Sequence, residues 1–336
     1  MEKLLSSLMS GWRVHRQREP LPLPPTFSLE VQDTINPSYD PSADVREMIS
    51  SLAYPAETFD VAARTNTGSG DTTLSFDSPR PSGDAVVDRV HLDWHVARDR
   101  FGRIVRAPAM LVLDILHGHN AVATFIARTF ARQGIHGFVM HMPHNAARRT
   151  HADGAFDWRN FVPSLTQAAA DARRSRDVIA SFPAVNSVGI QGTSLGGFVA
   201  TIAASIDQAF DPVLIALAGG DVNHVLSNGM MDAARVRKHL RQAGYDDQKL
   251  RRELWDVEPL RLAHRLDPRR TWLLSARWDQ VVPAASSRAL AMKIGLTESH
   301  QPKFLGCHYS CALGAKFILD EMIRDVRLGA IQKIAG

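Results

Sequence analysis

The pentapeptide Gly192-Thr193-Ser194-Leu195-Gly196 follows an apolar run at 188–191 and precedes a small-residue helical pattern at 198–205. This order predicts a strand, a sharp turn that carries Ser194, and then a helix. A serine at the tip of such a turn has a strained backbone, and glycines two positions to either side leave the room that it needs. The sequence therefore predicts a nucleophile elbow, with Ser194 as the nucleophile and Gly192 and Gly196 as its flanking glycines.

A serine nucleophile requires a histidine base and a carboxylate that orients the histidine. Two later segments offer these groups at the ends of apolar runs. The run 271–276 is followed by Asp279, and the short run 303–305 is followed by His308. We expect Asp279 to be the acid and His308 to be the base. Asp221, which follows the apolar run 212–218, is the competing acid.

The sequence Gly-Thr-Ser-Leu-Gly-Gly at 192–197, the Asp-x-Val-Val-Pro run at 279–283 and the late loop histidine resemble the α/β-hydrolase superfamily, within it the dienelactone-hydrolase and acyl-peptidase-like branches. The resemblance covers residues 70–336. It implies an α/β fold with an eight-stranded, mostly parallel sheet and helices on both faces. Ser194, Asp279 and His308 would then follow the fifth, seventh and eighth strands. The near-continuous apolar runs agree, because parallel strands are buried on both faces.

An oxyanion hole needs two backbone N–H donors, and the residue after the nucleophile, Leu195, supplies one of them. The strand-like run 109–116 ends at His117-Gly118-His119-Asn120, just before a helical pattern at 121–133. This segment resembles the His-Gly loop of esterases and lipases. The resemblance implies that the N–H of His119 is the second donor and that Gly118 lets the backbone approach the substrate. Asn120 is the alternative donor.

The histidines His117 and His119, with His141 and His144 one strand later, have a spacing that metal sites also use. A hydrolytic metal site would add nearby carboxylate ligands, and Asp114 is expected inside the strand. We therefore expect packing and oxyanion roles for these histidines, with no metal and no cofactor. His141 is expected to end the fourth strand.

The chain is expected to divide at residue 70. Residues 1–18 predict an amphipathic helix that docks on its own domain or on a second copy, which would give a homodimer through this segment. The alternative is that this helix lies on a membrane surface. Residues 19–45 predict a proline-rich extended arm. Residues 71–336 predict the hydrolase domain, which opens with a hairpin at 72–96. The long segment 222–268, with helical patterns at 230–242 and 247–255, predicts a cap over the site.

Composition limits the remaining functions. With 336 residues, 45 % of them hydrophobic, and a net charge of +4 with dispersed basic residues, the chain predicts one large domain and no nucleic-acid partner. No apolar run is long enough to cross a bilayer, so no stable membrane insertion is expected. The two cysteines, Cys307 and Cys311, are poorly spaced for a disulfide and fit a reducing, cytoplasmic location, and Cys307 is expected to be buried.

These features together predict a serine hydrolase that cleaves a small-molecule carboxylic ester. A peptidase or amidase would use the same three side chains. A non-catalytic binding protein on the same fold would be expected to lack one of them.

Overall fold

The computed structural model describes residues 18–31, 40, 42–54, 56–65, 70–116, 118–150, 156–310, 320, 323, 324 and 326. The helix predicted at 1–18 lies outside these residues except for Arg18, as do His117, Cys311 and part of the predicted proline-rich arm. Within the described residues, no helix is both long enough and apolar enough to cross a membrane.

Ten strands in the described part of the chain form one sheet in the order β1-β2-β3-β4-β6-β5-β7-β8-β9-β10. The pairs from β1 to β6 along this order are antiparallel, and those from β6 to β10 are parallel. The strands are β1 (Thr26–Val31), β2 (Glu57–Thr65), β3 (Thr72–Asp77), β4 (Arg89–His95), β5 (Ala107–Leu113), β6 (His136–Met140), β7 (Val185–Thr193), β8 (Val213–Ala216), β9 (Thr271–Ala276) and β10 (Lys303–Phe304).

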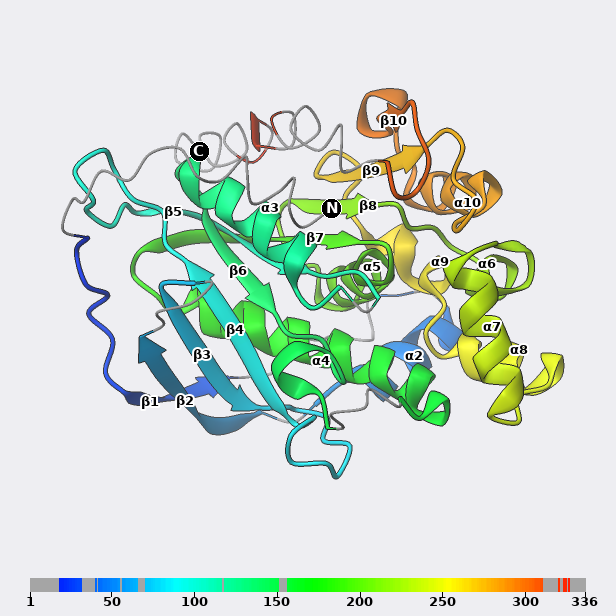
Figure 1. The fold of residues 1–336 in the computed structure, drawn as a ribbon, viewed down its shortest axis with the longest axis horizontal. Helices are drawn as coiled ribbons and strands as arrows, with labels where there is room; N and C mark the ends of the chain where they lie inside the picture. The colour runs from blue at the N-terminus through cyan, green and yellow to red at the C-terminus, as the bar shows by residue number, and fades with distance from the viewer. Residues whose placement is uncertain are drawn as a thin grey trace.

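Helices cover both faces of the sheet (Figure 1). Those that pack on the sheet or border it are α2 (Ala43–Leu52), α3 (Ala121–Arg132), α4 (Phe161–Ala180), α5 (Leu195–Asp207) and α10 (Ala284–Ile294). Four further α-helices lie between β8 and β9, and they are α6 (Val222–Asn228), α7 (Asp232–Gln242), α8 (Asp247–Trp255) and α9 (Pro259–Leu262).

The central strand β5 shows why the sheet needs helices on both faces. Its side chains alternate, so Leu111 and Leu113 enter the core shared with α4 and α5, while Met110 and Val112 enter the core shared with α3. All four side chains are fully buried. A strand that is apolar on both sides is stable only where both sides are covered, and this explains the continuous apolar run in the sequence.

The ten-stranded sheet is larger than the eight strands that the resemblance implies, although the fold class is as expected. The two additional strands, β1 and β2, come from residues before 70, where the sequence predicts a helix and an extended arm. β1 pairs with β2 and β2 pairs with β3, so the sheet begins earlier than the hairpin at 72–96. Helix α2 also comes from this segment, and its Met48, Ile49 and Leu52 are buried in the main core.

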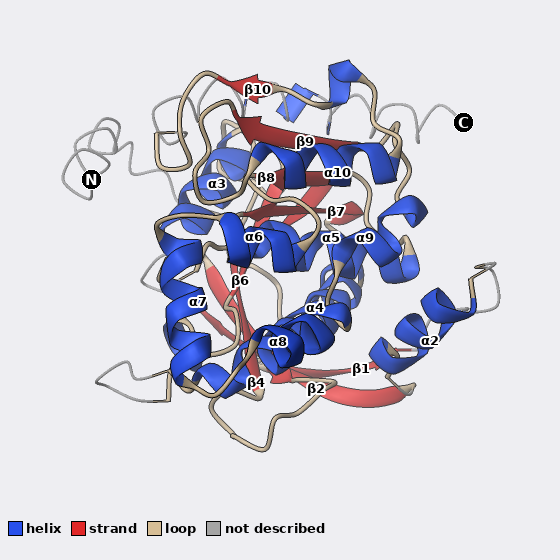
Figure 2. Cartoon of the chain, turned by 90° about the vertical axis from the view of Figure 1, so that its right-hand side faces the viewer, coloured by secondary structure: helices blue, strands red, loops and turns tan. Residues whose placement is uncertain are grey.

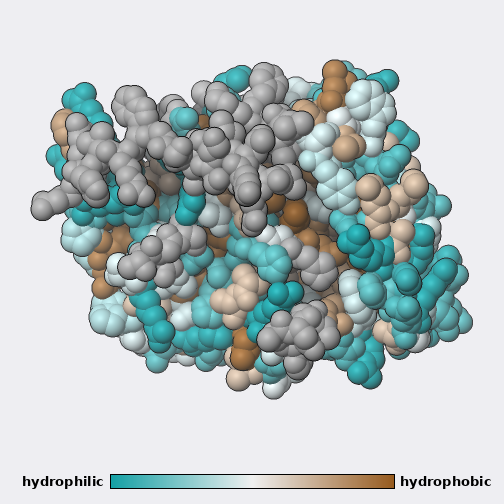
Figure 3. Space-filling model, viewed as in Figure 1, coloured by the Kyte–Doolittle hydropathy of each residue, from teal (hydrophilic) through white to brown (hydrophobic). Residues whose placement is uncertain are grey.

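The helices between β8 and β9 lie along one side of the molecule, at the carboxyl ends of the parallel strands (Figure 2). The observed α7 and α8 match the helical patterns at 230–242 and 247–255. The surface over α7 and α8 is mostly hydrophilic (Figure 3). The exposed basic side chains of these helices, which form part of this solvated face, are Arg235, Lys238, Arg241, Arg251 and Arg252. A bidentate ion pair from Arg261 to Asp44 joins α9 to α2, with distances of 2.6 and 3.0 Å.

Candidate active site

Ser194 lies at a strained turn between β7 and α5. Its backbone has φ 53° and ψ −117°, a combination that an L-residue rarely adopts, and α5 begins at the next residue. A Cβ on Gly192 would lie 2.1 Å from the carbonyl oxygen of Gly196, and a Cβ on Gly196 would lie 2.6 Å from the carbonyl oxygen of Leu113. Both glycines are therefore required by close backbone contacts, as the predicted elbow demands.

The structure brings the three predicted side chains into one chain of hydrogen bonds. His308 Nε2 lies 3.1 Å from Ser194 Oγ, and His308 Nδ1 lies 2.8 Å from Asp279 Oδ2. The second carboxylate oxygen of Asp279 accepts the N–H groups of Val281 and Val282, each at 2.9 Å. The Asp-x-Val-Val pattern thus fixes the carboxylate from one side while His308 contacts it from the other.

This arrangement determines the roles of the two ring nitrogens of His308. An ionised carboxylate can only accept, so Nδ1 must carry the proton that is donated to Asp279. In the neutral ring, Nε2 then presents its lone pair to the hydroxyl of Ser194. The side chains of His308 and Asp279 are only 9 % and 4 % exposed, so little water competes for these contacts. The geometry is that of a serine activated by an oriented histidine.

The expected oxyanion donors lie on two segments that meet at the end of β5. Leu195 is the first residue of α5, where N–H groups have no acceptor within the helix. His119 has φ 48° and Asn120 has φ 63° in the turn before α3. The N–H of Asn120 faces the carboxyl of Asp114, which makes His119 the better candidate of the two.

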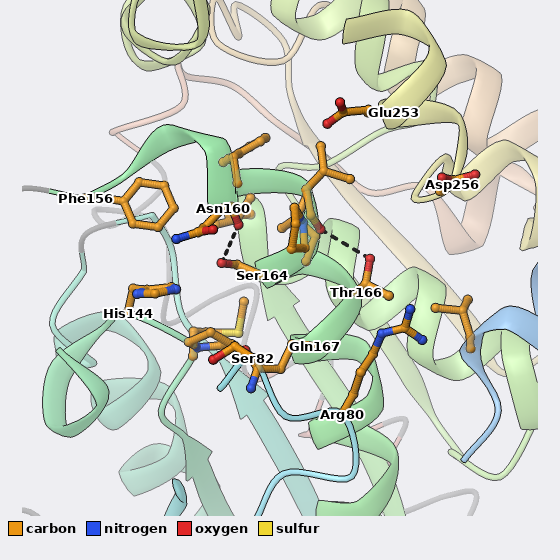
Figure 4. Close-up of a pocket in the computed structure, with 18 of the residues that line it drawn as sticks. Arg80, Ser82, His144, Phe156, Asn160, Ser164, Thr166, Gln167, Glu253 and Asp256 are labelled. Atoms are coloured by element: carbon orange, nitrogen blue, oxygen red, sulfur yellow. Dashed lines mark hydrogen bonds between the residues drawn. The ribbon is translucent and has the colours of Figure 1, made fainter. Parts of the chain in front are cut away.

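A cavity of about 890 Å³ borders this site. Leu195, next to the nucleophile, and Ile115 and Leu116, just before the His-Gly loop, form part of its wall. Figure 4 shows His144 and Phe156 on one side, Glu253 and Asp256 on the other, and Ser164 and Thr166 of α4 between them. Helix α2 also contributes to the wall, a contribution that the sequence pattern did not reveal. The size is that of a site for a small organic molecule.

The competing acid, Asp221, has a different local role. It is the N-cap of α6, where its Oδ1 accepts the N–H of His224 at 2.9 Å. The carboxylate that contacts His308 is Asp279.

The structure describes three of the four histidines of the metal alternative, all except His117. Each of the three has different neighbours. His119 lies in the turn before α3, His141 Nε2 contacts Asp93 Oδ2 at 3.0 Å, and His144 packs against Phe156. His141 follows the last residue of β6, close to the predicted position. Among the described residues, no three His, Cys, Asp or Glu side chains are grouped as ligands of a metal ion.

Two expectations about single residues are wrong. Cys307 is exposed, not buried, because β10 ends at Phe304 and the following turn projects from the edge of the sheet. Hydrogen bonds from Ser310 lower the pKa of its thiol. Asp114 lies just after β5 and not within it, since pairing with the neighbouring strands stops at Leu113.

No protein-family model and no curated protein matches the sequence. Solved structures do resemble this one. An acetyl xylan esterase from Paenibacillus sp. R4 is 13 % identical with a TM-score of 0.58, and the match covers 97 % of this chain and 92 % of that one. Acetyl xylan esterase 1 from Thermoanaerobacterium sp. JW/SL YS485 is 13 % identical with a TM-score of 0.60, over 86 % and 96 % of the two chains.

A puromycin-hydrolysing peptidase from Mycobacterium tuberculosis is also similar, at 13 % identity and a TM-score of 0.50, over 75 % of this chain and 42 % of that one. The identities are low, so what these likenesses establish is the architecture. The strand order, the strained serine turn after β7 and the similarity to these solved structures together show that the chain has the α/β-hydrolase fold.

Proposed function

We propose that the protein is a serine hydrolase that cleaves a small-molecule carboxylic ester through an acyl-enzyme intermediate. The observation that carries this proposal is the continuous hydrogen-bonded chain from Ser194 through His308 to Asp279. Such a chain has a specific chemical use, because a serine hydroxyl is a weak nucleophile until a base accepts its proton.

In the proposed mechanism, His308 Nε2 takes the proton of Ser194 while Oγ attacks the ester carbonyl. Asp279 holds the ring in the required tautomer and stabilises the imidazolium that forms. The N–H groups of Leu195 and His119 donate to the oxyanion of the tetrahedral intermediate. His308 then protonates the leaving alcohol, and water enters by the reverse sequence to release the acid and restore Ser194.

The test is a comparison of wild-type protein with Ser194→Ala on a series of p-nitrophenyl esters from acetate to octanoate. Acetate belongs in the series because two of the similar structures are acetyl xylan esterases. We expect the variant to keep its fold and to lose at least about a thousandfold in kcat. Ser299→Ala, at an exposed serine that does not line the cavity, is the matched control and should retain wild-type turnover. Equal hydrolysis by wild type and Ser194→Ala would refute the assignment.

Three further measurements separate the alternatives. A fluorophosphonate probe should label wild-type protein and not Ser194→Ala, whereas a non-catalytic binding protein would remain unlabelled. The matching p-nitroanilides test for amide cleavage with the same side chains. A chelator should leave the activity unchanged, because no step of the proposed mechanism uses a metal ion.

A further inference from the structure

Asp114 is a fully buried carboxyl at the carboxyl end of β5, and the proposed mechanism does not use it. Its Oδ1 accepts the N–H of Ala123 at 3.2 Å. The N–H groups of Ile115 and Asn120 also face the carboxyl. Three backbone donors between the end of β5 and the first turn of α3 thus converge on one side chain.

The loop also approaches this carboxyl very closely. A Cβ on Gly118 would lie 2.4 Å from Asp114 Oδ2, a distance that no real side chain tolerates. On the other side, a Cβ on Gly196 would lie 2.6 Å from the carbonyl oxygen of Asp114, so the first turn of α5 rests on the backbone of the same residue. Asp114 therefore contacts both segments that carry the proposed oxyanion donors, His119 and Leu195.

What distinguishes Asp114 is an unpartnered oxygen beside the candidate site. Burial raises the pKa of Asp114, and the facing groups that lower it are the backbone N–H groups of Ile115, Ala123 and Asn120 and the ring of His119. Among the described residues, Asp114 Oδ2 has no hydrogen-bond partner, and neither has the buried Oδ1 of Asn120. An unpaired buried oxygen destabilises a fold, so its presence beside a candidate site points to a functional constraint.

We propose that Asp114 is a positioning residue of the oxyanion hole. Its carboxyl holds the backbone at 118–120 against the first turn of α5, so that the N–H groups of His119 and Leu195 converge on the same point. The inference rests on the proposed function, because it assigns a role within that reaction. A purely structural role would be the capping of α3, since Asn120 makes no side-chain cap and Ala123 is near the start of that helix.

Kinetics and inhibitor binding distinguish these two roles. Asp114→Ala removes the acceptor, and we expect kcat to fall about 10- to 100-fold with KM changed by less than about threefold, because oxyanion contacts form only in the transition state. The affinity for a trifluoromethyl ketone, whose adduct carries an oxyanion, should fall by the same factor as kcat. Asp114→Asn keeps one accepting oxygen and should recover most of both.

Glu258 provides a matched control. It is 7 % exposed, burial raises its pKa, and it accepts the N–H groups of Asp221, Val222 and Leu260 at 2.8 to 3.0 Å. Glu258→Ala thus removes a buried carboxyl with three backbone donors at a distance from the His-Gly loop. We expect it to lower Tm while kcat and the ketone affinity of the folded protein remain at the wild-type level.

Gly118→Ala tests the same contact from the loop side if Asp114→Ala does not fold. The added methyl must displace the loop from Asp114, and it should produce the same loss of kcat and ketone affinity with KM retained. If the folded variants keep wild-type kcat and ketone affinity, Asp114 does not position the oxyanion hole. That result differs from a failure of the proposed function, in which wild-type protein and Ser194→Ala would behave alike.

Discussion

The hydroxyl of Tyr309 donates a 2.7 Å hydrogen bond to Asp232 Oδ2, which ties the loop that bears His308 to the first turn of α7. The ring of Tyr309 also meets the ring of His308 edge to face, at 5.5 Å between centroids. Burial and the Asp232 carboxylate raise the pKa of Tyr309 to about 12, so the hydroxyl keeps its proton and remains a donor near neutral pH. Helix α7 and the loop that bears the proposed catalytic base are therefore directly connected.

Removal of this hydroxyl should impair turnover more than folding. In Tyr309→Phe we expect kcat to fall about 2- to 10-fold, since a hydrogen bond of this kind contributes about 1 kcal/mol. Tyr245→Phe is the control, because Tyr245 also donates its hydroxyl in the cap region, to the carbonyl of Arg159. Steady-state kinetics on p-nitrophenyl acetate measures both. A greater loss of kcat in Tyr245→Phe than in Tyr309→Phe would contradict the connection.

The buried ion pair of Arg148 and Asp171 should dominate the electrostatic contribution to stability. Both side chains are fully buried, the pair is 2.7 Å apart, and Arg148 also donates to the carbonyl oxygens of Val87 and His141. Arg148→Ala leaves an uncompensated buried carboxylate and should lower the free energy of unfolding by about 3 to 5 kcal/mol. Arg269→Ala, which removes an 86 % exposed partner of Asp267, should have a much smaller effect, because water and salt screen an exposed ion pair. Urea unfolding compares the two, and similar losses would rule out the prediction.

Asp88 should make stability depend on pH in the acid range. Burial favours a higher pKa for Asp88, but hydrogen bonds from Ser82, Gly83 and Gln167 outweigh it and lower the pKa below its usual value. The carboxylate therefore stabilises the fold above the unfolded-state pKa of about 4, and this contribution is lost as the pH falls through the lower folded-state value. Asp88→Asn should lower Tm at pH 7, and the gap from wild type should narrow below about pH 4. A gap that stays constant from pH 7 to pH 3 would argue against this role.

Ser164 faces the middle of the cavity and tests whether the substrate enters it (Figure 4). Ser164→Phe should lower kcat/KM for p-nitrophenyl octanoate about tenfold or more while the acetate ester, which needs little of the cavity, is hydrolysed as before. Parallel kinetics on the two esters gives the ratio directly. An equal decrease for both esters would mean that the substitution disturbs the site itself rather than the cavity.

The three side chains of the hydrogen-bonded chain, Ser194, His308 and Asp279, could be found from the sequence because local patterns mark their positions. The N–H groups of Val281 and Val282 bind Asp279, so a stretch of four residues contains most of the information that fixes this carboxylate. The elbow is similarly local, since the close contact between Gly192 and Gly196 spans only five residues. Patterns of this length are visible without knowledge of the rest of the fold.

Other features depend on partners that are distant in the chain. The apolar run 109–116 continues past Leu113, but pairing ends there because Met140 and Gly192 are the last partners on either side. The position of Asp114 beyond the strand therefore follows from the neighbouring strands. β1 likewise exists through its pairing with β2, which joins Thr26 to Ala62 across a proline-rich segment. Long-range pairing of this kind leaves little trace in a local pattern.

Strand β10 pairs with β9 through only two residues, Lys303 and Phe304, at the outer edge of the sheet. His308 follows this edge strand by four residues, while Ser194 follows β7 in the buried centre of the sheet. Fraying at a short edge strand requires far less energy than opening of the core. On gradual warming, the protein should therefore lose its proposed activity reversibly several degrees before circular dichroism detects unfolding, and cooling from that interval should restore turnover.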